Sequence, residues 1–205
     1  MPRIIRLGLV VIIILASLSL SLPALAQNEA GFVAHGLFSA QPNQAFVIVP
    51  VTTCPVFGCA PGPTAFHVNA GVSFEGFVAR RLVNAHFASL AVELPVLAMP
   101  NRGTNLADTF STVAVTPGVR ANFLPGEGAS PFLSAGGGVV HFSGDTPSAT
   151  HGAGLFGGGI DFKTPLPHLG VRVEVKDLLT PWPGLFPKSG VMNNVVAGAG
   201  VVFRF

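Results

Sequence analysis

The last fifteen residues of the chain, 191–205, alternate between two kinds of position. The odd-numbered positions are apolar except for Asn193, whereas the even-numbered positions are mixed and end on Arg204. A period of two over this length is typical of a long β-strand whose two faces meet different surroundings. The apolar face comprises Val191, Val195, Ala197, Ala199, Val201, Phe203 and Phe205.

The same period recurs in seven earlier segments. It is clearest where Val171, Val173 and Val175 alternate with Arg172 and Glu174, and it is blurred by glycines in 131–142. The pattern predicts an all-β fold in which eight antiparallel strands form an up-and-down barrel. The predicted strands are 31–39, 66–79, 85–97, 110–123, 131–142, 151–162, 169–176 and 191–205.

The connections between these segments alternate in predicted length. Long loops are expected at 41–63, 100–108, 143–149 and 180–189, and short turns at 80–84, 124–130 and 163–168. Outer-membrane barrels have short periplasmic turns, longer outside loops and an even number of strands. We therefore expect both ends of the barrel domain on the periplasmic side.

The N-terminal segment has the features of a secretory signal peptide. Arg3 and Arg6 precede an apolar run from 7 to 22, and Ala24-Leu25-Ala26 supplies a small-residue cleavage site. We expect residues 1–26 to be removed, which leaves a barrel domain of residues 27–205 that begins at Gln27. No cysteine lies at the cleavage point, which argues against a lipoprotein.

Composition separates a membrane barrel from a soluble domain. Charged residues make up 10% of the chain, against about 25% in soluble domains. Outside the signal segment no apolar run is long enough for a spanning helix. Closed β structure is the other way to cross a bilayer, because it satisfies every backbone polar group. Nine basic and nine acidic residues then remain, and this neutral balance argues against a nucleic-acid partner.

The placement of the charges predicts which face of the barrel wall is inside. A soluble barrel has its charges outside, whereas a membrane barrel has an apolar exterior and a polar interior. The polar faces here carry a few charges separated by small residues, which suits a narrow interior. Since buried charges need partners, we expect a network of ion pairs that closes the lumen. Its predicted members are Glu75, Glu93, Arg120, Asp161, Arg172, Glu174, Lys176 and Arg204.

The signal peptide, eight alternating strands, charged lumen and terminal aromatic residue resemble the small outer-membrane barrels typified by the OmpA transmembrane domain. The resemblance covers residues 27–205 and rests on pattern rather than on a residue motif. It implies a transmembrane barrel in the outer membrane of a Gram-negative-type bacterium. It also implies that Phe203 and Phe205 belong to a C-terminal assembly signal. The expected partners are outer-membrane lipid, lipopolysaccharide and the barrel-assembly machinery, and the protein is expected to be monomeric.

Two cysteines and three histidines are further candidates for chemistry. Cys54 and Cys59 lie in the same loop of an exported chain with four residues between them, so a local disulfide is expected. His67, His141 and His151 fall near the outer mouth on the polar, luminal face. They could share a metal or pH-sensing site, or could lie apart across the mouth. The glycine triplets lack the helix and the Lys-Ser/Thr pair of a phosphate loop, so we expect them to make room for luminal side chains or to bend the wall.

The leading functional prediction is a non-enzymatic barrel with a structural or surface-interaction role and no cofactor. A second hypothesis is a lipid-modifying enzyme, because His141 and Ser143 resemble the His-x-Ser element of lipid A deacylases. That element lacks a placed carboxylate here, so the catalytic group is incomplete. A third hypothesis is a narrow channel for small or apolar solutes, and a fourth is a secreted soluble β protein.

Overall fold

The computed structural model describes residues 27–40, 46–48, 63–65, 68–103, 109–125, 127–144, 148–181 and 191–205. Two predictions lie outside these residues: the signal peptide at 1–26 and the disulfide between Cys54 and Cys59. His67 also lies outside them. Among the described residues, no helix is long and apolar enough to cross a membrane.

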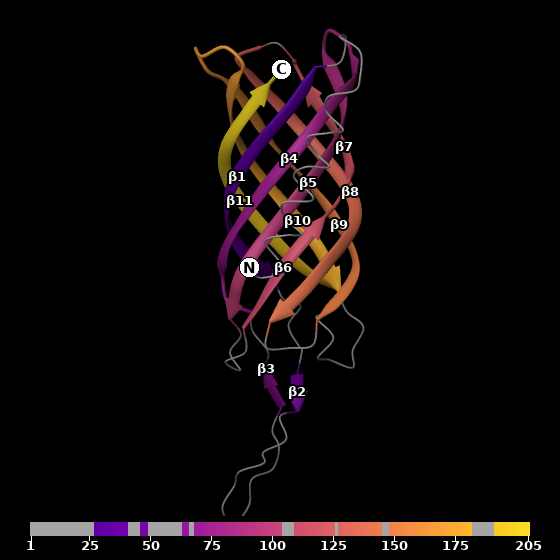
Figure 1. Ribbon diagram of the computed structural model, residues 1–205, viewed down its shortest axis with the longest axis vertical. Coiled ribbons are helices and arrows are strands. Elements are labelled where there is room, and N and C mark those ends of the chain that lie inside the picture. The colour runs from indigo at the N-terminus through magenta and orange to yellow at the C-terminus, as the bar shows by residue number, and fades with distance from the viewer. Residues whose placement is uncertain are drawn as a thin grey trace, which may run out of the picture.

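The described chain is a closed, all-antiparallel barrel of eight strands (Figure 1). The sixth and seventh extended segments lie end to end and together act as one strand, because each pairs with β5 on one side and β8 on the other. The wall closes where β1 pairs with β11 on one side and β4 on the other. A separate two-stranded sheet consists of β2 (Phe46–Ile48) and β3 (Pro63–Ala65). The barrel strands are β1 (Asn28–Ala40), β4 (Gly71–Asn84), β5 (Ala88–Gly103), β6 (Thr109–Val115), β7 (Gly118–Phe123), β8 (Ala129–Gly144), β9 (Ala149–Lys163), β10 (Leu169–Pro181) and β11 (Val191–Arg204).

The predicted fold class is confirmed, but the second and third strands are displaced from their predicted limits. The turn expected at Arg80 and Arg81 lies instead at 85–87, since both arginines remain in the ladder opposite Val92 and Ala91. A pair of charges resembles a turn in the sequence, yet Arg81 reaches the carboxylate of Glu29 at the rim of the barrel. The fourth strand is interrupted between β6 and β7, where Pro117 has no N–H to donate to a ladder.

The ends of the barrel differ less in connection length than expected. Three turns, 85–87, 124–128 and 164–168, lie at the end that also holds the C-terminus in Figure 1. At the other end, the connections 104–108 and 145–148 are as short as these turns. Only the connections from β1 to β4 and from β10 to β11 are clearly longer. The prediction of four long loops was therefore wrong for two of them.

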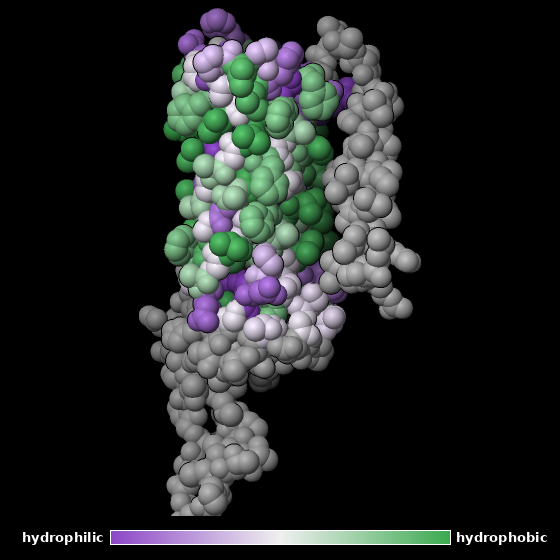
Figure 2. Space-filling view, turned by 60° about the vertical axis from the view of Figure 1, so that its left-hand side comes forward, coloured by the Kyte–Doolittle hydropathy of each residue, from purple (hydrophilic) through white to green (hydrophobic). Residues whose placement is uncertain are grey.

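The two faces of the wall follow the alternation in the sequence. The face seen in Figure 2 is mostly apolar across the middle of the barrel, and hydrophilic residues gather at both ends. Inside, the half near the three turns is charged, whereas the other half is apolar. The apolar cluster comprises Leu37, Val68, Leu97, Met99, Phe110, Ala114, Val140, Phe142, Leu155, Leu178, Met192 and Val196. The even-numbered residues of β4 face outward, yet Val68 is buried, because it precedes β4 and falls outside its alternation.

Candidate functional site: a charged barrel interior

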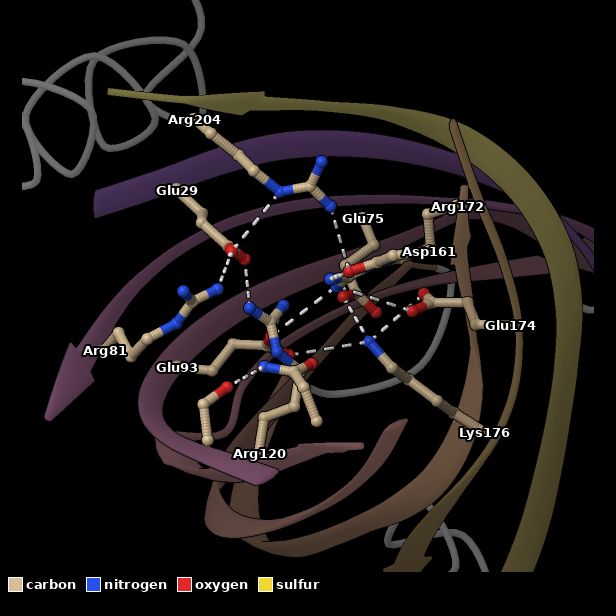
Figure 3. Close-up of polar contacts among 12 residues, drawn as sticks. Glu29, Glu75, Arg81, Glu93, Arg120, Asp161, Arg172, Glu174, Lys176 and Arg204 are labelled. Atoms are coloured by element: carbon tan, nitrogen blue, oxygen red, sulfur yellow. Dashed lines mark hydrogen bonds and ion pairs between the residues drawn. The ribbon is translucent and has the colours of Figure 1, made fainter. Parts of the chain in front are cut away.

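The interior half near the turns contains all eight residues predicted to line the lumen (Figure 3). Seven of them are buried, and Arg204 lies at the rim with 17% of its side chain exposed. They come from β4, β5, β7, β9, β10 and β11, on the inward-facing positions of each strand. Three further residues that were not in the predicted set, Glu29, His35 and Arg81, join them.

Arg172 occupies the centre of this cluster. Its Nε and Nη2 donate to the two oxygens of Asp161 at 2.7 and 2.9 Å, which is the bidentate geometry that suits a guanidinium best. Its Nη1 lies 3.6 Å from Glu93 Oε2. Two aromatic rings also pack against the guanidinium: Cζ lies 4.3 Å from the ring centroid of Phe77 and 4.4 Å from that of Phe132. Arg172 is fully buried among these partners.

Arg120 links two carboxylates from strands far apart in the sequence. Its Nη1 donates to Glu93 Oε2 at 2.8 Å, and its Nη2 donates to Glu29 Oε2. Glu29 Oε1 also lies 3.4 Å from Arg81 Nη2 and 3.5 Å from Arg204 Nε. Glu29 therefore connects the buried network to the rim of the barrel.

Lys176 and its partners form the part of the cluster that lies farthest from the three turns. Its Nζ is 2.5 Å from Glu75 Oε1, 3.1 Å from Glu174 Oε1 and 3.8 Å from Glu93 Oε1. Glu174 also accepts from the ring of His35, with Nε2 and Oε1 2.9 Å apart. Ligand atoms of His35, Glu75 and Glu174 lie within 4.8 Å of one another, a spacing that could hold a metal ion. The Lys176 ammonium already contacts both carboxylates, so the chain supplies its own cation there.

The charges in this half of the barrel balance. Five acids, Glu29, Glu75, Glu93, Asp161 and Glu174, face five bases, Arg81, Arg120, Arg172, Lys176 and Arg204. Burying a charge is tolerated only with a partner of opposite sign, and each of these charges has at least one. The ion pairs therefore fill the interior and connect the strands across it, and they do not expose a reactive group among the described residues.

Glycines make the space that the long charged side chains occupy. A Cβ added to Gly159 would lie 2.8 Å from both Cα and Cβ of Glu174, and one added to Gly157 would lie 2.6 Å from Cα of Lys176. A Cβ at Gly198 would lie 2.7 Å from Cα of His35. The inward-facing glycines thus allow close approach of the neighbouring strand at the levels where the ion pairs form.

The histidine and serine candidates do not come together in the described residues. His141 and Ser143 lie on the outward parity of β8, whereas His151 lies on the inward parity of β9 and packs against Phe142 at 6.1 Å between ring centroids. The expectation that His141 belongs to the polar luminal face was wrong, because Val140 and Phe142 are the inward residues there. The His141 ring contacts a hydroxyl, Thr150 Oγ1, at 2.8 Å from Nδ1.

The residues that sequence reasoning missed carried weak signals. Glu29 shares the inward parity of Val33 and His35, but it precedes the predicted first strand. His35 lies within the predicted strand 31–39 but was left out of the predicted network. Phe203 and Phe205, the predicted assembly signal, are outward-facing and 51% and 61% exposed.

These observations define the chain as a small eight-stranded antiparallel β-barrel of the kind found in bacterial outer membranes. Among solved structures, Neisserial surface protein A (NspA) aligns with a TM-score of 0.57 and 10% identity, over 88% of this chain and 99% of that chain. The outer membrane protein OprG from Pseudomonas aeruginosa aligns with a TM-score of 0.49 and 10% identity, over 88% and 95%. The outer membrane enzyme PagL aligns with a TM-score of 0.42 and 14% identity, over 85% and 97%.

At these identities the likeness shows the fold alone. No protein-family model matches the sequence, and no curated protein matches it significantly. These likenesses therefore say nothing about the activity of this chain.

Proposed function

We propose that this protein resides in the bacterial outer membrane as a monomeric barrel with a structural or surface-interaction role. The observation that carries the proposal is the reversal of polarity across the wall: apolar side chains face out, and paired charges face in. Each of the eight strands exposes at least one large apolar side chain. Examples in the order of the chain are Phe32, Phe74, Leu90, Val119, Leu133, Phe156, Val175 and Phe203.

Lipid is the solvent that matches this exterior, because a water-exposed patch of this extent is rare on soluble monomers. Membrane barrels of this type are exported and assembled, which fits the predicted signal peptide and the assembly signal of Phe203 and Phe205. The expected partners are outer-membrane lipid, lipopolysaccharide and the assembly machinery. Surface contacts would be made by the connections at the end opposite the three turns.

The filled interior favours this role over a channel. Arg120, Arg172, Phe132, Lys176 and Glu75 rank among the largest fully buried side chains in the described residues. The apolar cluster closes the other half of the lumen. The enzyme hypothesis rests on His141 and Ser143. Among the described residues, His141 contacts the Thr150 hydroxyl rather than a carboxylate that could orient its ring.

The proposal is tested by cell fractionation combined with gel mobility of boiled and unboiled samples. We expect the protein in the outer-membrane fraction, and we expect a band that shifts on boiling, because a closed barrel resists detergent until it is heated. A protein found in the soluble periplasmic fraction without a shift would contradict the membrane proposal.

The same purified protein distinguishes a structural barrel from a channel and from an enzyme. In planar bilayers we expect no stepwise conductance, and with lipid A as substrate we expect no change in acylation by the wild-type protein. Steady conductance steps would support a channel instead. Lipid deacylation that disappears in His141→Ala and Ser143→Ala variants would support the enzyme.

A further inference from the structure

Arg102 is a buried cation that stands apart from the charged network. It lies at the end of β5 opposite the turns, beyond the apolar cluster, with 2% of its surface exposed. Its Nη1 donates to Asn194 Oδ1 at 2.8 Å and its Nη2 donates to the hydroxyl of Ser39. Its Nη1 also lies 4.0 Å from Met99 Sδ, and its Cζ lies 5.4 Å from the centroid of the Phe110 ring. All four partners are formally neutral. Among the described residues, no carboxylate pairs with this guanidinium.

A local irregularity in β5 directs Arg102 into the lumen. Even-numbered residues of β5 up to Ala98 face outward, so regular alternation would also place Arg102 outside. Between the pairs Met99–Thr112 and Arg102–Phe110, β5 contains one residue more than β6. This extra residue forms a β-bulge. Asn101 within the bulge has a positive φ of 47°, a conformation that asparagine tolerates better than most residues. The bulge changes the parity and turns the guanidinium inward.

The guanidinium edge formed by Nε and Nη2 has different partners in Arg172 and in Arg102. In Arg172, Nε and Nη2 grip the two oxygens of Asp161. In Arg102, Nη2 donates to Ser39, and Nε is buried without an acceptor. A buried donor without an acceptor is unfavourable, and a buried charge without a counter-charge more so. Among the described residues, Arg102 therefore has one free donor, Nε, on the same edge with which Arg172 binds the carboxylate of Asp161.

The surroundings of Arg102 favour an anion over any other ligand. The charged network in the other half of the barrel is balanced by itself, so Arg102 adds one uncompensated positive charge to the described interior. Asn194 is fixed by donating to the Leu178 carbonyl and to Thr180, which orients its oxygen toward Arg102. The hydroxyl of Thr112, on the strand paired with this part of β5, is also buried without a partner and can donate. Ser39 is only half-buried, and Asn101 next to Arg102 is exposed, so the site lies just beneath the rim.

We propose that Arg102 binds a small oxyanion, a phosphate, sulfate or carboxylate group, at the end of the lumen opposite the three turns. The anion takes Nε and Nη2 of Arg102 as a bidentate pair. The Ser39 hydroxyl, which donates to Asn194 Oδ1 at 3.3 Å, turns to donate to the anion instead. The bulge at Asn101 holds the guanidinium in place. The group comes either from a dissolved anion or from an anionic lipid headgroup, since both present the same oxygens.

The test is equilibrium unfolding in urea of the full mature chain, folded in a neutral detergent, with inorganic phosphate or sulfate titrated against chloride at constant ionic strength. We expect the unfolding midpoint to rise with phosphate or sulfate and to saturate as a binding curve. Arg102→Gln should raise the apparent dissociation constant by about ten- to a hundredfold, because it removes the charge-assisted hydrogen bonds. A midpoint that responds no more to phosphate or sulfate than to chloride would overturn the proposal.

Arg80→Gln is the matched control, because Arg80 lies on the outward face of β4 near the turns. It should retain the full anion response, and an equal loss in both variants would contradict a site at Arg102. If Arg102→Gln does not fold, Arg102→Lys keeps the charge but loses the bidentate edge. It should bind the anion more weakly than wild type, and unchanged binding would count against the proposed geometry.

Two further experiments distinguish a lipid headgroup from a dissolved anion as the ligand of Arg102. Folding into zwitterionic vesicles with and without an anionic phospholipid, in chloride only, tests the headgroup: a stability gain that requires Arg102 assigns the site to lipid. A gain with inorganic phosphate in detergent assigns it to a dissolved anion. If Asp108→Asn or Asp145→Asn lowers stability as Arg102→Gln does, and added anions restore neither variant, the counter-charge is a loop carboxylate of this chain and the proposal fails.

Discussion

Arg172 illustrates how single residues hold this barrel together. Its charge is buried, and it is stabilised by a bidentate pair with Asp161 and by the faces of Phe77 and Phe132. The sequence predicted that Arg172 and Asp161 face inward, because each sits on the polar parity of an alternating strand. It also offered one clue to the pair itself, since the two residues lie on consecutive strands. The ring contacts join β4 and β8 to β10, and nothing in local alternation indicates them.

Asp161→Asn tests the energetic weight of this pair. Removing the carboxylate charge leaves a buried guanidinium only partly compensated, so we expect the free energy of unfolding in lipid vesicles to fall by about 3 kcal/mol. Glu127→Gln is the control, because Glu127 is exposed in the turn between β7 and β8, and it should change the same quantity by less than about 0.5 kcal/mol. Equal effects of the two substitutions would mean that the interior pair adds little to stability.

At the scale of the strand, β9 shows why its glycines matter. Gly157 and Gly159 face inward beside Lys176 and Glu174, whereas Gly152 faces outward with open space where a Cβ would be. The sequence predicted that the glycine triplets either make room for luminal side chains or bend the wall, and the first alternative describes Gly157 and Gly159. It left open which glycine makes room for which charged side chain, because that depends on the register between β9 and β10. In that register Gly159 lies opposite Glu174 and Gly157 lies opposite Lys176.

Gly159→Ala and Gly152→Ala therefore form a matched pair within one strand. The new methyl group at 159 meets the backbone of β10 at Glu174, so we expect the free energy of unfolding to fall by about 1–3 kcal/mol. The methyl group at 152 meets open space, so stability should be unchanged or slightly higher, by less than about 1 kcal/mol. Urea titration of both variants measures the difference. An unchanged free energy of unfolding for Gly159→Ala would contradict the prediction, because it would mean that β9 and β10 can move apart without destabilising the barrel.

At the scale of the whole molecule, the barrel has an apolar exterior and a polar interior around a closed wall. The long-range pairs set this arrangement: Lys176 reaches Glu75 across 101 positions of sequence, and Arg120 reaches Glu29 across 91. The interior is also layered, with charges toward the turns and apolar side chains toward the opposite end. A narrow lumen filled in this way agrees with the structural role proposed above.

A single outward charge tests whether the apolar band lies in lipid. Val173 is outward-facing within β10 and 46% exposed, whereas Leu166 is 60% exposed in the turn between β9 and β10. In lipid vesicles we expect Val173→Lys to lower the free energy of unfolding by about 2–4 kcal/mol, because it places a charge in the hydrocarbon. Leu166→Lys should cost about 0–1 kcal/mol. Similar costs for both variants would place Val173 outside the hydrocarbon.

The sequence by itself determined the number of strands, their antiparallel order and the side of the wall that most residues face, because a period of two is a local property of extended chain. It therefore identified eight luminal charges without their partners. The tertiary structure decided which charges meet, since the stagger between strands sets the level of each side chain along the barrel. It also decided the inward direction of Arg102, because a single extra residue at the bulge reverses the parity. Alternation could not predict either result, because both depend on contacts between strands.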